Sequence, residues 1–446
     1  MIETPFPRFD APLGSRADDV ARQLAAHAAM DGPARHALLQ RQLASLLGHA
    51  RAASPFWARR LARFEASLRS GRTVRLSDLP ILTRRDLQRA GASMRARSAE
   101  IAPRDLLAAR TSGSTGRPVE VLRYLPFYAP VHVAIAMLEH RWHQRDTGST
   151  LAVIKDAPDA EQRGWGWGAE RTEGAGLRAV RNLIEHSPEA LLAWLDEIAP
   201  RYLSTTPTMA LRLAQLALSR PGGVLRIEQV VTFGELVTDQ LRETVRAAFG
   251  AKVVDVYSCE ELGWIALQCP RHEHLHVMSA SVLLEIVDGS GRPCPAGRPG
   301  RVLLTGLHSH AMPLIRYEIG DHAQWGAPCD CGIRLPVLAR IWGRERSFLR
   351  MPDGSYRIAR LTGEHWRRVA PVGEYKVVQY ADGQIEAFVT APRRLEAVEL
   401  ERLAAMLTQV LGEGLRVIVT QTDRIDWDAR WKRTDVIRLN RLRGGS

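Results

Sequence analysis

The stretch IEQVVTFGELVTDQLRETVRAAFGAKVVDVYSCEE, residues 227–261, decides the fold. Its opening run, 227–233, is short, apolar and rich in β-branched residues, which is typical of a buried strand. Thr238 then starts an amphipathic segment that stops at Gly250, as a capped helix does. A second strand-like run follows at 251–258. Strand, helix and strand in this order predict two parallel strands joined by a helix.

Polar residues follow both of these predicted strands. Gly234 and Glu235 come directly after the first strand, and Glu260 and Glu261 come after the second. In sheets of parallel strands, ligands bind outside the carboxyl ends of the strands. These two strand ends are therefore expected to border a functional site.

The remaining chain predicts an α/β protein with two domains. Residues 1–110 are largely helical in pattern, and helices alternate with short strands up to about residue 265. The pattern then changes to a beta-rich part at 266–340. We expect a large N-terminal core, 1–342, with mixed sheets flanked by helices. A small, mobile α+β domain is expected at 343–446.

Composition excludes several classes of function. The formal net charge is +12, but the 61 basic residues include only four lysines, a bias that indicates genome composition. No basic run is interleaved with aromatic residues, so no nucleic-acid partner is expected. The start of the chain lacks the pattern of a signal peptide, and no stretch approaches about 20 apolar residues. We therefore expect a cytoplasmic protein with no membrane association.

The loop TSGSTGRP, residues 111–118, has the composition of a phosphate-binding loop. Gly113 and Gly116 allow close approach of the backbone to a ligand. Four neighbouring hydroxyl groups and successive backbone N–H groups suit an anion. The loop lacks the Gly-Lys-Ser/Thr ending of the Walker pattern. Composition alone leaves a flexible linker and a phosphate cradle both open.

Five further motifs follow this loop in order along the chain. They are TFGE at 232–235, DVYSCEELG at 255–263, PLIRYEIGD at 313–321, GRER at 343–346 and WKR at 431–433. Together the six resemble the adenylate-forming superfamily of acyl-CoA ligases and adenylation domains, and within it the phenylacetate-CoA ligase branch. The resemblance extends from about residue 50 to the C-terminus.

The resemblance implies an AMP-forming acid–thiol ligase that depends on ATP and Mg²⁺. Such an enzyme activates a carboxylic acid, here expected to be aromatic, as an acyl-AMP. It then transfers the acyl group to CoA or to the phosphopantetheine thiol of an acyl carrier protein. The expected assembly is a monomer or a homodimer.

The resemblance also assigns roles to individual positions. Lys432 is expected to bridge the carboxylate and the α-phosphate, as a compact ammonium on a flexible stem can do. Glu261 is expected to hold magnesium, and Thr115 to act with the loop in catalysis. Tyr257 is expected to stack on adenine and Asp321 to accept the ribose hydroxyls. The remaining nucleotide-binding candidates are Thr111, Ser112, Gly113, Ser114, Gly116, Gly234, Glu235, Arg340 and Arg344, with a hinge expected at 343–347.

Two short cysteine motifs predict a structural zinc site. The ligands expected are Cys269 and His272 of a C-x₂-H motif, together with Cys329 and Cys331 of a C-x-C motif. Three thiolates and an imidazole form a closed tetrahedral site, which suits a structural rather than a catalytic ion. His274 and His276 are rival fourth ligands. The zinc is expected to pin the beta-rich part to the core.

The segment RYLPFYAPVHVAIAMLEHRWH, residues 123–143, is rich in aromatic residues and is expected to form a helix that borders the acyl pocket. Simple core packing would explain the same composition.

Several positions depart from the family pattern. Ser258 replaces a glycine, Glu260 a serine or threonine, Glu318 an arginine, Arg346 the hinge acid, and Trp431 the glycine before the lysine. These changes lie around the nucleotide and the hinge. They leave two alternatives open, an adenylating enzyme that passes the acyl group to an amine and a nucleotide-binding homologue that has lost catalysis.

Overall fold

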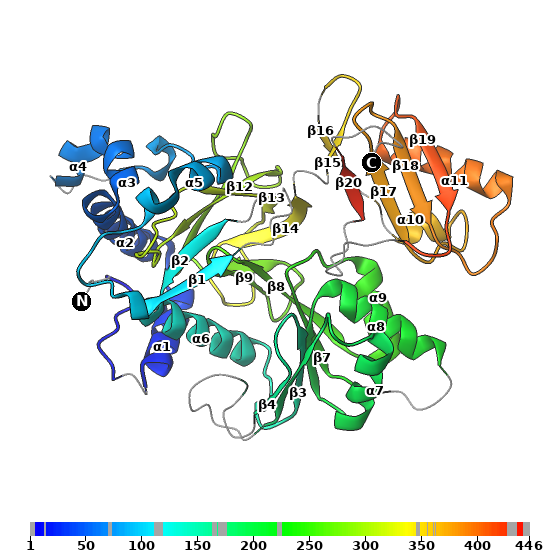
Figure 1. Ribbon diagram of the computed structural model, residues 1–446, viewed down its shortest axis with the longest axis horizontal. Helices are drawn as coiled ribbons and strands as arrows, with labels where there is room; N and C mark the ends of the chain where they lie inside the picture. The colour runs from blue at the N-terminus through cyan, green and yellow to red at the C-terminus, as the bar shows by residue number, and fades with distance from the viewer. Residues whose placement is uncertain are drawn as a thin grey trace.

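The computed structural model shows a large N-terminal body and a small C-terminal one (Figure 1). It describes residues 5–12, 15–69, 74–110, 119–162, 167, 176–220, 225–344, 348–354, 356–359, 361, 363–425 and 435–439. Within these ranges, no helix combines the length and the hydropathy needed to cross a bilayer.

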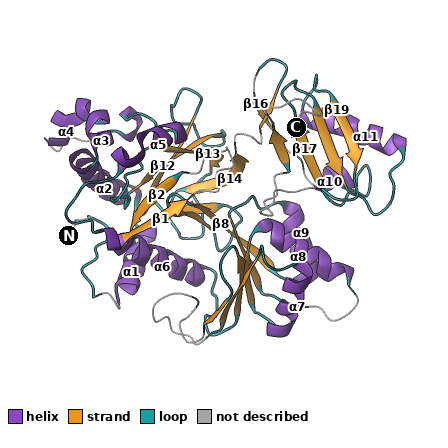
Figure 2. Ribbon diagram, viewed as in Figure 1, coloured by secondary structure: helices purple, strands orange, loops and turns teal. Residues whose placement is uncertain are grey.

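A single twelve-stranded sheet forms the centre of the large body (Figure 2). Its strand order is β11-β12-β13-β14-β10-β9-β8-β7-β6-β3-β5-β4. The strands of its α/β half are β3 (Leu151–Lys155), β4 (Ala160–Gln162), β5 (Arg178–Asn182), β6 (Tyr202–Thr205), β7 (Gln229–Phe233) and β8 (Lys252–Cys259). Pairing is parallel from β5 through β3, β6 and β7 to β8. The prediction of an α/β fold built on parallel strands is confirmed.

The strand–helix–strand unit of residues 227–261 folds as expected. Helix α9 (Asp239–Phe249) connects β7 to β8, with Thr238 accepting a hydrogen bond from the Leu241 N–H and Gly250 ending the helix at φ 69°. Leu241, Val245 and Phe249 are fully or almost fully buried. Burial of each such side chain contributes roughly 1.5–3 kcal/mol. Helices α7 (Pro188–Ile198), α8 (Pro207–Ser219) and α9 lie together against this half of the sheet (Figure 1).

The predicted beta-rich part belongs to the same sheet. The turn between β8 and β9 (Gly263–Gln268) reverses the chain, and the two strands pair antiparallel. The further strands are β10 (Leu275–Val277), β11 (Val282–Val287), β12 (Gly300–Gly306), β13 (Tyr317–Trp325) and β14 (Val337–Arg344). The prediction of a separate beta-rich subdomain at 266–340 is corrected in this respect: the β8–β9 hairpin, which has a register shift between Tyr257 and Ser258, joins these strands to the same sheet.

Helices precede the sheet, as the N-terminal pattern predicts. They are α1 (Arg16–Ala29), α2 (Gly32–Ala53), α3 (Pro55–Arg60), α4 (Glu65–Arg69) and α5 (Arg84–Ala90). Thr83 and Asp86 form a reciprocal capping box at the start of α5. The helical lead-in ends before residue 110, because β1 (Leu106–Arg110) pairs antiparallel with β2 (Glu120–Tyr124). The candidate phosphate loop at 111–118 connects these two strands and lies outside the described residues.

Residues 123–143 form the expected helix, α6 (Leu125–Trp142). It packs against α1, and its buried face includes Phe127, Val131 and Ile135. The next turn carries a buried ion pair between Glu139 and Arg145.

The C-terminal body has its own sheet and its own core. Its elements are β15 (Phe348–Arg350), β16 (Tyr356–Ile358), α10 (Gly363–Arg367), β17 (Tyr375–Gln379), β18 (Ile385–Val389), α11 (Ala397–Leu411), β19 (Val417–Gln421) and β20 (Val436–Arg438). The sheet order is β19-β18-β17-β20, and α11 packs against β19. Contacts to the large body include an ion pair of Arg367 with Glu243 and a hydrogen bond from the Gln240 side chain to the Gly373 carbonyl.

Candidate functional site

Two acidic residues, one in a turn and one on a strand, come together at the large sheet. Glu261 lies in the turn between β8 and β9, and Asp321 lies within β13. Both are largely buried, each with 9% relative exposure. Burial, and then the carboxylates of Glu261 and Asp321, raise the pKa of the neighbouring Cys259 thiol.

Each carboxylate accepts a hydrogen bond from a tyrosine on the opposite strand. The Tyr257 hydroxyl of β8 donates to Asp321 at 2.8 Å, and the Tyr317 hydroxyl of β13 donates to Glu261 at 3.0 Å. This crossed pair of bonds ties the two strands together across the site. We call these four residues the carboxylate cluster. Burial, followed by the neighbouring carboxylates, raises the pKa of both tyrosines, so both remain neutral donors.

Two arginines flank the carboxylate cluster. The Arg344 Nε, at the end of β14, lies 3.2 Å from Asp321 Oδ1, and an Arg84 Nη1 lies 3.9 Å from Glu261 Oε1. Burial raises the pKa of Asp321, and Arg344 and Tyr257 partly offset that effect. The cluster therefore holds its carboxylates with neutral donors and partly exposed cations, which leaves lone pairs on the acidic oxygens for a ligand.

The structure places the other predicted nucleotide residues as follows. Gly234 has φ +81°, a conformation that favours glycine, at the end of β7. Glu235 accepts a hydrogen bond from the Thr208 N–H at 3.1 Å and so contacts the start of α8. Arg340 is exposed and stacks over Trp342 at 4.5 Å, whereas Arg344 contacts Asp321. Thr111, Ser112, Gly113, Ser114, Thr115, Gly116, Lys432 and hinge residues 345–347 lie outside the described residues.

Sequence reasoning missed Tyr317 and Arg84 as members of the site. A signal for Tyr317 existed, because Tyr317, Ile319 and Asp321 alternate as the buried positions of β13 and share one face of the sheet. Arg84 lies more than 170 residues away in the chain and reaches Glu261 only through the fold. Glu318, which replaces the arginine of the family pattern, forms an ion pair with Arg301 at 2.6 Å.

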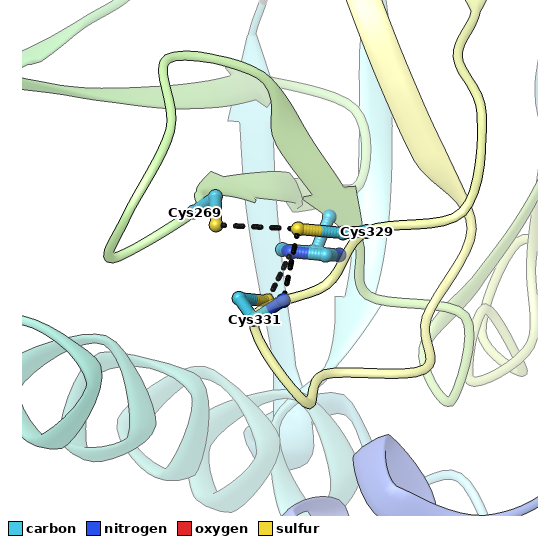
Figure 3. Close-up of side chains that lie close together, drawn as sticks. Cys269, Cys329 and Cys331 are labelled. Carbon is cyan, nitrogen blue, oxygen red and sulfur yellow. Dashed lines mark hydrogen bonds between the residues drawn. The ribbon is translucent and has the colours of Figure 1, made fainter.

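Three cysteines (Figure 3) and one histidine converge in a second cluster. Cys269 follows β9, His276 lies on β10, and Cys329 and Cys331 lie between β13 and β14. The four ligand atoms all lie within 4.8 Å of one another. We call these four residues the sulfur cluster.

Distances in the sulfur cluster fit a tetrahedral ion. The Sγ atoms of Cys269 and Cys329 are 3.8 Å apart, and Cys331 Sγ lies 3.3 Å from His276 Nε2. Zinc–sulfur bonds of about 2.3 Å place two sulfur ligands of a tetrahedron about 3.8 Å apart. The donor set and its spacing therefore suit zinc.

The geometry corrects the predicted fourth ligand. His272 does not join the four clustered ligand atoms. It is exposed and lies 2.6 Å from Asp330, whereas the buried His276 occupies the fourth position. The two histidines differ because β10 pairs with both β9 and β14, which brings residue 276 under the cysteines. Among the described residues, the rival ligand His276 therefore fits the fourth position, and His272 groups instead with Cys329 and Asp330.

A pocket opens beside the carboxylate cluster. Its walls come from β2, α6, the β8–β9 turn and the segment that follows β12, and its empty volume is about 590 Å³ including the part open to solvent. Glu261 is among the lining residues.

Comparison with known proteins gives a family match over most of the chain. The sequence pattern of the AMP-binding enzyme family matches residues 28–311. A phenylacetate-coenzyme A ligase of Thermus thermophilus is 31% identical over 160 residues, which cover 33% of this chain and 35% of that ligase. A phenylacetate-coenzyme A ligase of Pseudomonas putida is 25% identical over 134 residues, covering 28% and 30% of the two chains. The aligned part thus spans about a third of each curated relative.

Solved structures extend the likeness in fold. A 2-hydroxyisobutyryl-CoA ligase in its postadenylation state, in complex with 2-HIB-AMP, matches with a TM-score of 0.73 at 18% identity, over 93% of this chain and 91% of that chain. An anthranilate CoA ligase in complex with anthranoyl-AMP matches with a TM-score of 0.54 at 15% identity, over 75% and 66%. At these low sequence identities, the matches show that the chain shares the fold of these proteins.

Proposed function

Because the chain belongs to the AMP-binding enzyme family, we propose that it is an ATP-dependent, AMP-forming ligase. It activates a carboxylic acid as an acyl-AMP and transfers the acyl group to the thiol of CoA or of a carrier-protein phosphopantetheine. The curated relatives are phenylacetate-coenzyme A ligases, which supports an aromatic acid and a CoA acceptor.

The carboxylate cluster carries this proposal. Adenylation brings a negatively charged acid to a negatively charged triphosphate, so the site needs fixed points for a cation and for the nucleoside. Glu261 and Asp321 are two buried carboxylates held by Tyr317 and Tyr257. After accepting the tyrosine hydrogen bond, each carboxylate still has lone pairs that can accept further hydrogen bonds. The cluster can therefore receive ligands without rearranging its own hydrogen bonds.

Within the cluster, we assign Glu261 to magnesium and Asp321 to the ribose. A carboxylate together with phosphate oxygens is the usual environment of Mg²⁺, and Glu261 is the acid that lines the pocket. Asp321 accepts hydrogen bonds, and the two ribose hydroxyls supply donors. The Arg344 guanidinium beside Asp321 is half exposed, which places a cation at the edge of this ribose position.

We place the carboxylic acid in the pocket beside Glu261. Apolar side chains, including Val131, Ile135 and Leu314, line it, and so do the aromatic rings of Tyr128 and Trp264. An apolar lining with few polar groups is typical of a site for a small organic ligand. An acid seated there has its carboxylate next to the metal position.

We assign the sulfur cluster to a structural zinc ion. Its four ligands close the tetrahedron, which leaves no open position for substrate. The cluster joins the ends of β9, β10 and the β13–β14 connection. An ion there would fix the end of β9, which Glu261 precedes, and the connection that follows β13, the strand of Asp321.

Exchange of labelled pyrophosphate into ATP tests the function. We expect exchange that depends on an added aromatic acid and on Mg²⁺. Lys432→Ala is expected to reduce it by about 100-fold or more, because a single group that stabilises transition-state charge contributes on this scale. Lys376→Ala, a lysine of β17 in the same domain, is the matched control. Undiminished exchange in the Lys432 variant would remove the proposed role of Lys432.

The acceptor is identified in the same preparation. CoA, a holo carrier protein and simple amines are added in turn, and thioester or amide products are measured. Thioester formation supports the ligase, whereas amide formation alone replaces it with an amide-forming enzyme. No exchange with any acid, together with tight ATP binding, would identify a nucleotide-binding protein without catalysis.

A further inference from the structure

The pocket beside Glu261 contains polar groups that the proposed function leaves without a role. They are His132 of α6, Ser281 just before β11, and Arg123 of β2, and all three line the pocket. The inference that follows rests on the proposed function and concerns which acid the pocket selects.

His132 is fixed in orientation by two aromatic rings. Its ring stacks on Tyr128, one helical turn earlier, with centroids 5.3 Å apart and an interplanar angle of 24°. Trp264 of β9 meets the same ring edge to face at 5.5 Å and 84°. The imidazole is thus held by ring contacts from two elements, α6 and β9.

These ring contacts leave the nitrogens of His132 unused. Among the described residues, neither ring nitrogen forms a hydrogen bond. Burial, followed by the positive charges of Arg123 and Lys155, lowers the pKa of His132 to about 4. The ring is therefore neutral at physiological pH and offers one donor and one acceptor.

Two further polar atoms at the pocket are buried without a partner in the described structure. They are the Ser281 hydroxyl and the Nε of Arg123. The remaining guanidinium of Arg123 is occupied, since it donates to the Glu260 carbonyl and lies over the Tyr128 ring at 4.4 Å. Buried polar atoms of proteins are almost always hydrogen-bonded, and leaving one unpaired is unfavourable. A ligand that supplies partners here would satisfy them.

The rest of the pocket suits a flat ring. Tyr128, Trp264, Leu262 and Met312 give it aromatic and apolar walls. At Gly306 the wall has no room for a side chain, because a Cβ there would lie 2.2 Å from Ser309 Oγ and 2.4 Å from Leu262 Cδ2. Glycine therefore lets Ser309 and Leu262 pack closely against this part of the wall.

We propose that this pocket selects small aromatic carboxylic acids that carry a hydroxyl group on the ring, and that His132 is the specificity-determining residue that binds this hydroxyl. A phenolic hydroxyl both donates and accepts, as the neutral imidazole does. An unsubstituted ring would displace water from the pocket and leave the imidazole and its polar neighbours unpaired. Sites that bind a substrate hydroxyl discriminate strongly against analogues that lack it.

The test compares pairs of acids that differ only in the hydroxyl group. Benzoate is compared with the three hydroxybenzoates, and phenylacetate with 4-hydroxyphenylacetate, by kcat/KM for pyrophosphate exchange. The wild type is expected to prefer at least one hydroxylated acid by about 10-fold to 100-fold over its parent. His132→Phe keeps a ring between Tyr128 and Trp264 and is expected to reduce this ratio to about threefold or less. His132→Asn restores a donor and an acceptor and should recover part of the preference.

The ratio of kcat/KM between the two members of a pair separates a loss of specificity from a general loss of activity. A purely structural defect would lower exchange with both members of a pair equally, whereas loss of the proposed hydrogen bond lowers only the hydroxylated one. His36→Phe, an exposed histidine of α2, is the matched control and is expected to keep the wild-type ratio. Ser281→Ala gives a second variant should His132→Phe fail to fold. Equal use of both members of every pair by the wild type would overturn the proposal.

Calorimetric titration of the same acids without ATP distinguishes this proposal from the proposed function. If no acid supports exchange, the proposed ligase function is wrong, but the selectivity of the pocket can still be measured by binding. Tighter binding of a hydroxybenzoate than of benzoate, lost in His132→Phe, would still support the selection. Equal or absent binding of both would overturn it.

Discussion

The carboxylate cluster and the sulfur cluster are both connected to β9 and β13, but they differ in how their polar groups are satisfied. Strand β9 runs from the turn of Glu261 to Cys269, and β13 carries Asp321 and leads to Cys329. In the carboxylate cluster, two tyrosine hydroxyls pair with the acids. In the sulfur cluster, thiols and an imidazole face one another at ligand spacing.

This difference fits the two proposed roles, a nucleotide site for the carboxylate cluster and a zinc site for the sulfur cluster. Tyrosine donors pair with both carboxylates without a nucleotide. Three thiols together offer weak donors and weak acceptors, and they become strong ligands only as thiolates on a metal. We therefore expect changes in the first cluster to alter catalysis and changes in the second to alter stability.

The largest expected effect is on activity. Glu261→Gln keeps the size of the side chain and an acceptor for Tyr317 but removes the negative charge proposed to hold magnesium. Exchange is expected to fall by about 100-fold or more. Zinc content and melting temperature, measured on the same samples, are expected to stay within error of the wild type. A fall in zinc content would show that the two ends of β9 are not independent.

The converse change is expected to act mainly on stability. Cys329→Ser removes a thiolate from the sulfur cluster and should lower bound zinc below about half an equivalent, because a three-ligand site binds the ion more weakly. Melting is expected about 5 °C or more below the wild type. Cys294→Ser is the matched control, since Cys294 is buried but lies outside the cluster. Wild-type protein prepared without chelators that contains no zinc would contradict the assignment.

A pair of histidine variants, with a smaller expected effect, tests which histidine is the fourth ligand. His276→Ala is expected to lose zinc, whereas His272→Ala is expected to retain it, because His276 groups with all three cysteines and His272 groups only with Cys329 and Asp330. Zinc released to a colorimetric chelator measures both variants. The reverse order would mean that the loop after Cys269 rearranges around the ion.

The two clusters also show what the sequence can predict. The strand–helix–strand unit at 227–261 was predicted correctly because its caps and periodicity are local signals. The motifs brought Glu261 and Asp321 into one candidate site although 60 positions separate them. The continuous twelve-stranded sheet was not predicted, because pairing of β8 with β9 depends on a turn that composition does not distinguish from a domain boundary.

Side-chain partners were the least predictable feature. His272 fits the C-x₂-H spacing better than His276, yet strand register determines which side chain lies under the cysteines. Tyr317 and Arg84 reach Glu261 from β13 and α5, and no local pattern records such a long-range contact. Motif spacing therefore located both clusters, while their final membership depends on the register of β10 and β13.

The smallest expected effect concerns the pH dependence of stability at Asp321. Burial raises the pKa of this carboxyl above its usual 3.8, with Arg344 and Tyr257 opposing the shift. Because its pKa is raised in the folded state, the Asp321 carboxyl contributes to stability when it is protonated. This contribution is fully present below the pKa of the unfolded state and is lost as pH rises through the pKa of the folded state. Wild type should therefore lose stability relative to Asp321→Asn as pH rises above about 4, with only a small change in melting temperature. Thermal melts of both proteins across this range measure the difference, and a wild-type advantage that grew with pH would show that pairing with Arg344 outweighs burial.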